Sequence, residues 1–316
     1  MTQEPMKNYV HYLDVFERNG FEKRKKMRRK PKSSTGQTTD HLAESTDHAD
    51  LVLKMTYRPA RFEAEWLTDY ISGFYNEMQI TDVLRNVKGG KEATVYCCRA
   101  HPNTGYELLA AKVYRPRKLR NLRNDALYRE GRVTLDDAGK GIVRGRRPKV
   151  AMQKHTRFGQ ELRHTSWLGH EYGTMQLWYE AGVAVPKPLT SSDNVILMEY
   201  LGEEGEAAPP LHAVRLERDE AQVLFQRLLK DVELMLACGR IHADLSAFNV
   251  LYWDGAVKII DFPQAVDPFV NPRAFDLLAR DVTRLCEYFA RYRIDAHGPS
   301  LAREMWERCI PTPELD

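Results

Sequence analysis

The sequence has few cysteines and no long apolar run. Its five cysteines among 316 residues are an odd number, and their positions lack the paired spacing of a zinc site. Cys97 and Cys98 stand in a strand-like run, so we expect buried, reduced thiols rather than a disulfide. No apolar segment approaches membrane-spanning length, and the N-terminus lacks the apolar centre of a secretory signal. We therefore expect a cytoplasmic protein without membrane contact.

The net charge is also small, at +3, but it hides strong local asymmetry. Residues 1–56 are polar, with eight Lys or Arg between Lys23 and Lys32, and are predicted to be a disordered tail. Residues 115–163 hold fifteen Lys or Arg against five Asp or Glu. Each basic segment is either a solvated stretch or a contact for RNA or a ribosomal particle, which would weaken with rising salt.

One stretch orders three polar side chains as a phosphoryl-transfer site needs them. Asp244 and Asn249 stand five residues apart in His242-Ala243-Asp244-Leu245-Ser246-Ala247-Phe248-Asn249, and Asp261 follows twelve residues later. The protein-kinase signature has this spacing, with the first Asp as base and the Asn and second Asp as metal ligands. Apolar periodicity before the loop indicates a helix ended by Gly239, and residues 250–260 indicate a strand, a turn and a strand. The simpler alternative is a His-Asp pair in an ordinary turn.

The preceding part of the chain reads as a helix and an antiparallel sheet. We expect a helix over 61–76, then strands over 80–87, 93–98 and 106–114, with a glycine turn between the first two. Lys112 lies among small and apolar residues of the last strand, where an ammonium is costly unless an anion meets it. It is either a phosphate-binding lysine or a solvent-facing edge residue.

A predicted helix over 167–179 offers the anionic partner of this lysine. Glu171 is the first candidate and Glu161 the second. A buried strand over 195–200 follows, and its end, Met198-Glu199-Tyr200, is either an adenine-binding hinge or a plain core strand. Together these elements predict an α+β, two-lobed, protein-kinase-like fold, with a small antiparallel-sheet N-lobe over 57–200 and a reduced helical C-lobe over 201–316.

The combined motifs resemble the RIO family of atypical serine/threonine protein kinases, from about Ile80 to Tyr292. The resemblance rests on Gly89-Gly90-Lys91-Glu92-Ala93-Thr94-Val95-Tyr96, on Ala111-Lys112-Val113-Tyr114, on the His242 to Asn249 loop and on Ile259-Ile260-Asp261-Phe262-Pro263-Gln264-Ala265-Val266. It implies ATP and Mg²⁺ as ligands, with Mn²⁺ as a substitute, and phosphorylation of an unidentified protein or of the chain itself. No winged-helix pattern precedes the kinase-like region, which indicates the subgroup without that domain.

The same resemblance implies a role for individual residues. Asp244 would be the catalytic Asp, Asn249 and Asp261 the metal ligands, and Lys112 with Glu171 the phosphate-positioning pair. The nucleotide would further contact Gly89, Gly90, Lys91 and Val95 of the loop and Met198, Glu199 and Tyr200 of the hinge. Asp261 is also a candidate phospho-acceptor, as in some family members.

Departures from the kinase pattern shape the expected activity. Lys88 and Gly89 replace the Ser and Thr of the family loop. Ala243 replaces the usual kinase Arg, so we expect no basic residue beside the catalytic Asp that could read a phosphorylated activation loop. Residues 262–274 are too few for a long activation loop and a peptide groove, and the chain leaves little room for C-terminal helices. The hypotheses are a RIO-type kinase linked to ribosome assembly, an ATPase-type switch that binds RNA, and a small-molecule kinase, which the short C-terminal region disfavours.

Overall fold

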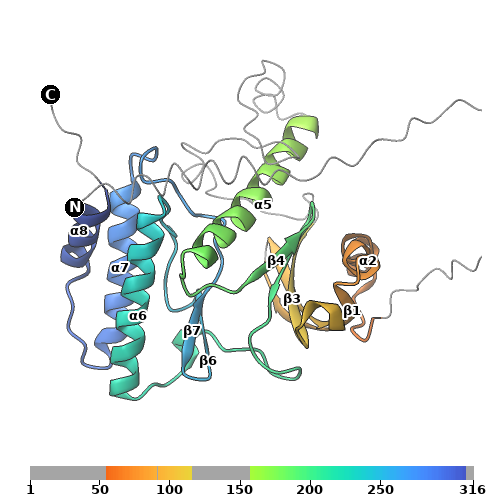
Figure 1. Cartoon of the computed structure of the whole chain (residues 1–316), viewed down its shortest axis with the longest axis horizontal. Helices are drawn as coiled ribbons and strands as arrows, with labels where there is room; N and C mark the ends of the chain where they lie inside the picture. Colours follow the sequence, from red (N-terminus) through yellow and green to blue (C-terminus); the bar gives the residue numbers. More distant parts are fainter. Residues whose placement is uncertain (1–54, 91, 116–156, 311–316) are drawn as a thin grey trace, which may run out of the picture.

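The computed structural model describes residues 55–90, 92–115 and 157–310, and for residues 157–167 the helical backbone alone. The described chain has the expected two-lobed, protein-kinase-like α+β architecture, with a sheet at one end and three helices at the other (Figure 1). Lys91, the basic tail and nearly all of the predicted basic insertion lie outside the described residues. The predicted division into lobes at residue 200 stays a prediction.

The N-lobe is built on a five-stranded antiparallel sheet with the order β1-β2-β3-β5-β4. The strands are β1 (Ile80–Gly89), β2 (Ala93–Ala100), β3 (Leu108–Tyr114), β4 (Pro188–Ser191) and β5 (Val195–Glu199). Four of them lie where the sequence pattern predicts a strand. The short edge strand β4 was not predicted, because it begins with the last proline of a Pro-Lys-Pro segment and has no alternating apolar pattern.

Helix α2 (Arg61–Asn76) covers this sheet and has the predicted bounds. Its Leu67, Ile71 and Phe74 recur at helical spacing and are buried against strand residues such as Val83 and Leu197. These contacts form a separate hydrophobic core for the N-lobe. The lysine strand β3 lies at the centre of the sheet, paired with β2 and β5 on its two sides, so Lys112 is not on an edge strand.

Helix α5 (Arg157–Glu180) lies between the sheet and the C-terminal helices (Figure 1). It begins ten residues before the predicted start, in a polar segment that has no apolar periodicity. Trp178 near its end is fully buried, stacks with the His242 ring at a centroid distance of 6.1 Å and meets the Phe262 ring edge-on at 5.2 Å. This aromatic cluster fixes the end of α5 to the segments that carry Asp244 and Asp261.

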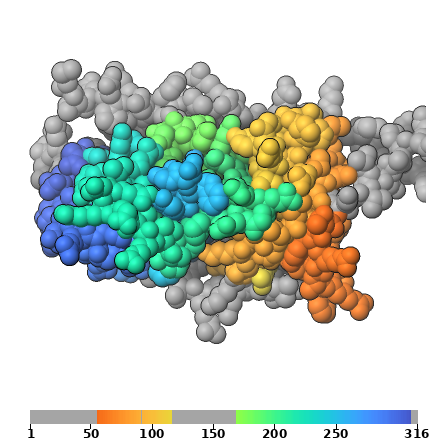
Figure 2. Space-filling view, turned by 90° about the horizontal axis from the view of Figure 1, so that it is seen from below, coloured from red at the N-terminus to blue at the C-terminus, as the bar shows by residue number. Residues whose placement is uncertain are grey.

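The C-lobe consists of a hairpin and three helices. The hairpin strands are β6 (Val250–Trp253) and β7 (Ala256–Ile259), and the helices are α6 (Arg218–Ala237), α7 (Ala274–Ala290) and α8 (Gly298–Cys309). Two short 3₁₀ turns, η1 (Pro102–Thr104) and η3 (Leu211–Ala213), complete the described elements. Seen from below, the hairpin lies on the surface between α6 and the sheet-bearing end (Figure 2).

Helix α8 packs closely on α7, and this contact depends on one glycine. A Cβ added to Gly298 would lie 2.5 Å from the Cα of Thr283, so only glycine permits this approach. We expected the chain to leave little room for C-terminal helices, and within the described residues one short helix, α8, follows α7. Within the described ranges, none of the helices combines the length and the apolar composition needed to cross a membrane.

Candidate functional site

Three charged side chains from three distant segments meet at the junction of the lobes. The Nζ atom of Lys112 on β3 lies 2.6 Å from Oε1 of Glu171 on α5 and 2.9 Å from Oδ1 of Asp261, which follows the hairpin. The side chains of Lys112 and Glu171 are 12% and 2% exposed, whereas that of Asp261 is 48% exposed. The lysine thus joins a buried anion to an anion that solvent or a ligand can reach.

The charges of this cluster stabilise one another. Burial alone would lower the pKa of the Lys112 ammonium, but the carboxylates of Asp261 and Glu171 raise it well above its usual value. Lys112 in turn lowers the pKa of Asp261. The Tyr114 hydroxyl donates a hydrogen bond to Oε2 of Glu171, so both oxygens of this buried carboxylate have a donor. These shifts keep Lys112 protonated and Asp261 ionised at neutral pH.

The loop that carries Asp244 and Asn249 is tied to the segment that carries Asp261. The side-chain amide of Asn249 donates to the Asp244 carbonyl at 2.9 Å, and the Ile260 amide donates to the Asn249 carbonyl at 2.9 Å. A nitrogen of the buried His242 ring lies 3.1 Å from the Ile260 carbonyl. Burial lowers the pKa of this ring, so it is neutral at physiological pH. These bonds place Asn249 beside the residue that precedes Asp261.

Two residues of the site have a left-handed backbone. Ala243 has φ 63° and Asp261 has φ 71°, a region that side-chain-bearing residues rarely occupy. Such strain costs about 1–3 kcal/mol per residue and persists only where the surrounding contacts impose it. In both cases the affected turn sets the direction of a carboxylate, that of Asp244 or that of Asp261 itself.

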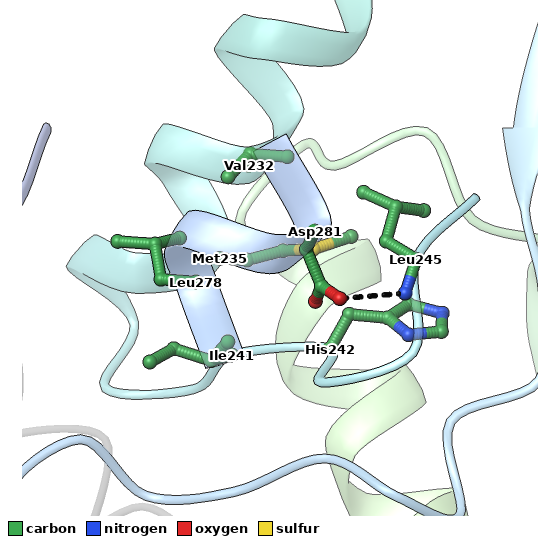
Figure 3. Close-up of a pocket in the computed structure, with 7 residues that line it drawn as sticks. All are labelled: Val232, Met235, Ile241, His242, Leu245, Leu278 and Asp281. Atoms are coloured by element: carbon green, nitrogen blue, oxygen red, sulfur yellow. Dashed lines mark hydrogen bonds between the residues drawn. The ribbon is translucent and has the colours of Figure 1, made fainter. Parts of the chain in front are cut away.

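Helix α7 packs against the loop that carries Asp244 and holds its backbone. Asp281 accepts a hydrogen bond from the Leu245 amide at 3.1 Å, and Arg280 donates to the Ala243 carbonyl. Figure 3 shows Asp281 directed at the Leu245 amide. Burial raises the pKa of Asp281 to about 7, and among the described residues its Oδ2 has no hydrogen-bond partner.

A small cavity separates this carboxyl from helix α6 (Figure 3). Its lining consists of Val232, Met235, Ile241, His242, Leu245, Leu278 and Asp281. With a volume of about 10 Å³, it is far too small for a nucleotide. The cavity is therefore a packing feature beneath the loop that carries Asp244, whose side chain is exposed, as is that of Asp261.

A basic residue from a distant part of the chain lies beside Asp244. Arg284 of α7 places Nη1 3.0 Å from Oδ1 of Asp244. Ala243 stands where the kinase signature has an arginine, so no arginine directly precedes Asp244 in the chain. Helix α7 supplies one from forty residues further along. Sequence spacing could not reveal this contact, because it depends on how α7 packs beneath the loop.

The predicted glycine loop forms the turn between β1 and β2. The Gly90 amide donates to the Ala93 carbonyl at 2.9 Å, and a Cβ on Gly90 would lie 2.9 Å from the same oxygen. Gly89 has more space, since a Cβ there would meet only the Arg115 side chain at 3.8 Å. Val95 pairs with Lys112 across the β2–β3 ladder, which places the loop strand directly beside the lysine.

The predicted hinge residues lie at the end of β5, but their side chains point to different partners. Met198 is half-buried and packs against the larger hydrophobic core, which includes residues of α5 and of the C-terminal helices. The Glu199 carboxylate accepts from the Lys187 amide at 3.0 Å and from Lys258 at 3.3 Å. The Tyr200 hydroxyl accepts from Arg85 at 2.5 Å. Any contact of Glu199 or Tyr200 with adenine would therefore use the backbone, and the Glu199 amide already donates to the Lys187 carbonyl.

Among the described residues, no group of three or more His, Cys, Asp or Glu side chains could hold a metal ion. The predicted ligands, one Asn and one Asp, are hard oxygen donors of the kind that Mg²⁺ prefers, and Mg²⁺ keeps several waters or phosphate oxygens besides. Because the Asn249 amide nitrogen is held by the Asp244 carbonyl, its Oδ1 points away from that bond. The donor set therefore fits a metal that is shared with a phosphate ligand.

Comparison with known proteins gives the family. The model of the RIO domain matches residues 127–301, more than half of the chain. The chain belongs to the RIO family. The match includes α5 with Glu171, the loop that carries Asp244 and Asn249, Asp261 and α7, while Lys112 and the glycine loop precede it.

Several RIO proteins are similar to the chain at moderate identity. The RIO1 serine/threonine-protein kinase of Chaetomium thermophilum is 29% identical over 236 residues, 71% of this chain and 42% of the relative. The human RIO1 kinase is 28% identical over 230 residues, 72% of this chain and 36% of the relative. Rio1 of Haloferax volcanii is 34% identical over 143 residues, 45% of this chain and 48% of the relative. The chain thus spans less than half the length of these relatives.

Sequence reasoning missed the buried carboxylates on α6 and α7 and the side chains of Tyr114 and Arg284. Asp281 and Asp231 each stand on the apolar face of a helix, at a spacing of three or four from buried leucines, and this position was an available signal. Asp231 is fully buried and accepts from the Ala184 amide at 3.0 Å. Tyr114 and Arg284 carried no such signal, because an aromatic strand residue and a surface arginine are ordinary.

Proposed function

We propose that the chain is an ATP- and metal-dependent serine/threonine protein kinase of RIO type. The observation that carries this proposal is the position of the Lys112 ammonium between the buried Glu171 and the exposed Asp261. An ammonium held this way can meet the α- and β-phosphates while the carboxylate of Asp261 turns to a metal. The relatives named as serine/threonine-protein kinases support the same activity.

The roles of the remaining residues follow from their contacts. Asp244 is exposed enough to accept the proton of an attacking hydroxyl, since its side chain is 48% exposed. Asn249 and Asp261 would hold Mg²⁺, or Mn²⁺ in its place, and this ion would screen the phosphate charge. The Gly89-Gly90 turn would cover the phosphates, since it adjoins the strand that pairs with β3. Chemistry then needs positioning and charge screening more than covalent help.

Transfer of the γ-phosphate from ATP tests the proposal. Wild-type chain with Mg²⁺ should label itself or casein, whereas Asp244→Asn and Lys112→Ala should lose at least about 100-fold in rate. Lys230→Ala is a matched control, because Lys230 is an exposed lysine on α6. Removal of the metal by EDTA should abolish labelling, and added Mg²⁺ should restore it. Equal labelling by wild type and both site variants would refute the assignment.

The same assay separates a kinase from an ATPase-type switch. A switch would release inorganic phosphate in a reaction that still needs Lys112 and Asp261, but no protein would become labelled. A cytoplasmic location and a contact of residues 115–163 with RNA or a ribosomal particle stay predictions from the sequence. For the RNA contact, affinity should fall steeply with salt and on neutralisation of the basic residues in 144–149; binding that ignores both changes would exclude it.

A further inference from the structure

The catalytic loop receives three charged side chains from one helix, and they act on it differently. Arg280 and Asp281 bind backbone groups, the Ala243 carbonyl and the Leu245 amide. Arg284, one helical turn further on, instead binds the side chain of Asp244 at 3.0 Å. Two of the contacts therefore hold the loop in shape, and the third acts on the carboxylate that is proposed to receive the proton.

The exposure of this ion pair indicates that it contributes little to folding. The side chains of Arg284 and Asp244 are 38% and 48% exposed. Exposed ion pairs typically contribute little to stability, because solvent screens the charges and two side chains lose conformational freedom. The ion pair matters more for the orientation of the Asp244 carboxylate. The short Asp side chain has few rotamers, and a hydrogen bond to one of its oxygens selects one of them.

The positive charge of Arg284 gives the ion pair a second consequence. The proposed reaction brings the carboxylate of Asp244 close to the phosphates of ATP, and like charges at short range repel. Lys112 is engaged with Glu171 and Asp261, whereas Arg284 lies directly on Asp244. A guanidinium stays charged at every physiological pH and has five donor N–H groups, so it can retain Asp244 and still face a phosphate.

We propose that Arg284 is a positioning residue for phosphoryl transfer, an inference that rests on the proposed kinase function. By binding Oδ1 of Asp244, it directs the other carboxylate oxygen at the incoming hydroxyl and offsets the repulsion between the carboxylate and the phosphates. In the reaction the hydroxyl oxygen bonds to the γ-phosphorus, the bond to the β-phosphate oxygen breaks, ADP leaves, and the hydroxyl proton passes to Asp244. Arg284 itself exchanges no proton.

Substitutions at position 284 separate the effect of orienting the Asp244 carboxylate from the effect of the positive charge. Arg284→Lys keeps the charge but loses the planar fork, Arg284→Gln keeps a hydrogen-bond donor without charge, and Arg284→Ala loses both. We expect kcat for autophosphorylation of the full chain to fall about 10–30-fold in the Ala variant. KM for ATP should rise by a smaller factor, because the charge that offsets the repulsion is lost as well. The Gln variant should lie between Ala and wild type, and the Lys variant should recover the most activity. Arg303→Gln, at an exposed position of α8, is the charge-matched control.

Thermal unfolding and the Asp244→Asn variant complete the design. A loss of kcat without a shift of Tm beyond about 2 °C supports a positioning role, because a purely structural role would lower both. The proposal is overturned if Arg284→Ala keeps kcat within twofold of wild type, if its loss follows Tm, or if it gains activity, which would make the pair an inhibitory contact. Failure of the proposed function looks different, since wild type itself would then label no protein.

Discussion

Neutralising Glu171 tests the ion pair at the centre of the site. The Glu171→Gln side chain has the same shape, but its NH₂ group must face either the Lys112 ammonium or the Tyr114 hydroxyl, both of which are donors to the wild-type carboxylate. One buried donor then loses its acceptor, at a cost of about 1–3 kcal/mol. Lys112 keeps its bond to Asp261 and is drawn toward it. We expect this cost to lower the free energy of unfolding without unfolding the chain, and the displaced Lys112 to slow catalysis by a comparable free energy.

Glu161 on the same helix supplies the control, because sequence reasoning left it as the second candidate. The two glutamates are ten residues apart, which corresponds to about 15 Å along an α-helix, so one lysine cannot bind both. Converted at about 1.4 kcal/mol per factor of ten, the expected cost lowers kcat/KM for ATP about 5–150-fold in Glu171→Gln. Glu161→Gln should stay within about twofold of wild type.

Steady-state autophosphorylation at varied ATP gives kcat/KM, and thermal unfolding of the same preparations monitors folding. The reasoning about the ion pair is wrong if Glu171→Gln stays within threefold of wild type, or if Glu161→Gln loses as much. A fall of Tm that accounts for the lost activity would instead make Glu171 a structural residue. A Tyr114→Phe variant should show a smaller loss in the same direction, because it removes one of the two donors to Glu171.

Three further predictions follow from the packing of the site. Burial raises the pKa of Asp281 from 3.8 to about 7, so the free energy of unfolding should fall as the pH rises between these values. Asp281→Asn should remove that pH dependence in urea titrations, and an unchanged slope would mean that another group causes it. Trp178→Ala should lower the free energy of unfolding by about 3–5 kcal/mol, because the ring is fully buried, and a urea midpoint near that of wild type would contradict this. Gly90→Ala should raise KM for ATP several-fold, because its Cβ would meet the Ala93 carbonyl, whereas Gly89→Ala should not; equal effects would refute the steric argument.

The sequence was sufficient for the elements with strong local patterns. The bounds 61–76 follow from apolar residues at helical spacing, and the hairpin follows from the turn at Asp254-Gly255, where both residues have positive φ. The order of Lys112, the glutamate helix, the Asp244 loop and Asp261 was enough to predict a kinase-like fold. The edge strand β4 and the first ten residues of α5 were missed, because neither segment has the periodicity that marks a strand or a helix.

The tertiary structure decided which of the local candidates meet. Sequence offered two glutamates for Lys112, and the placement of α5 against β3 brings Glu171 to it. Sequence offered no cation for Asp244, and the packing of α7 under the loop supplies Arg284. The physical reason is the same in both cases: local patterns record which face of an element is apolar, whereas contacts between polar side chains depend on the distances between elements that long-range packing sets.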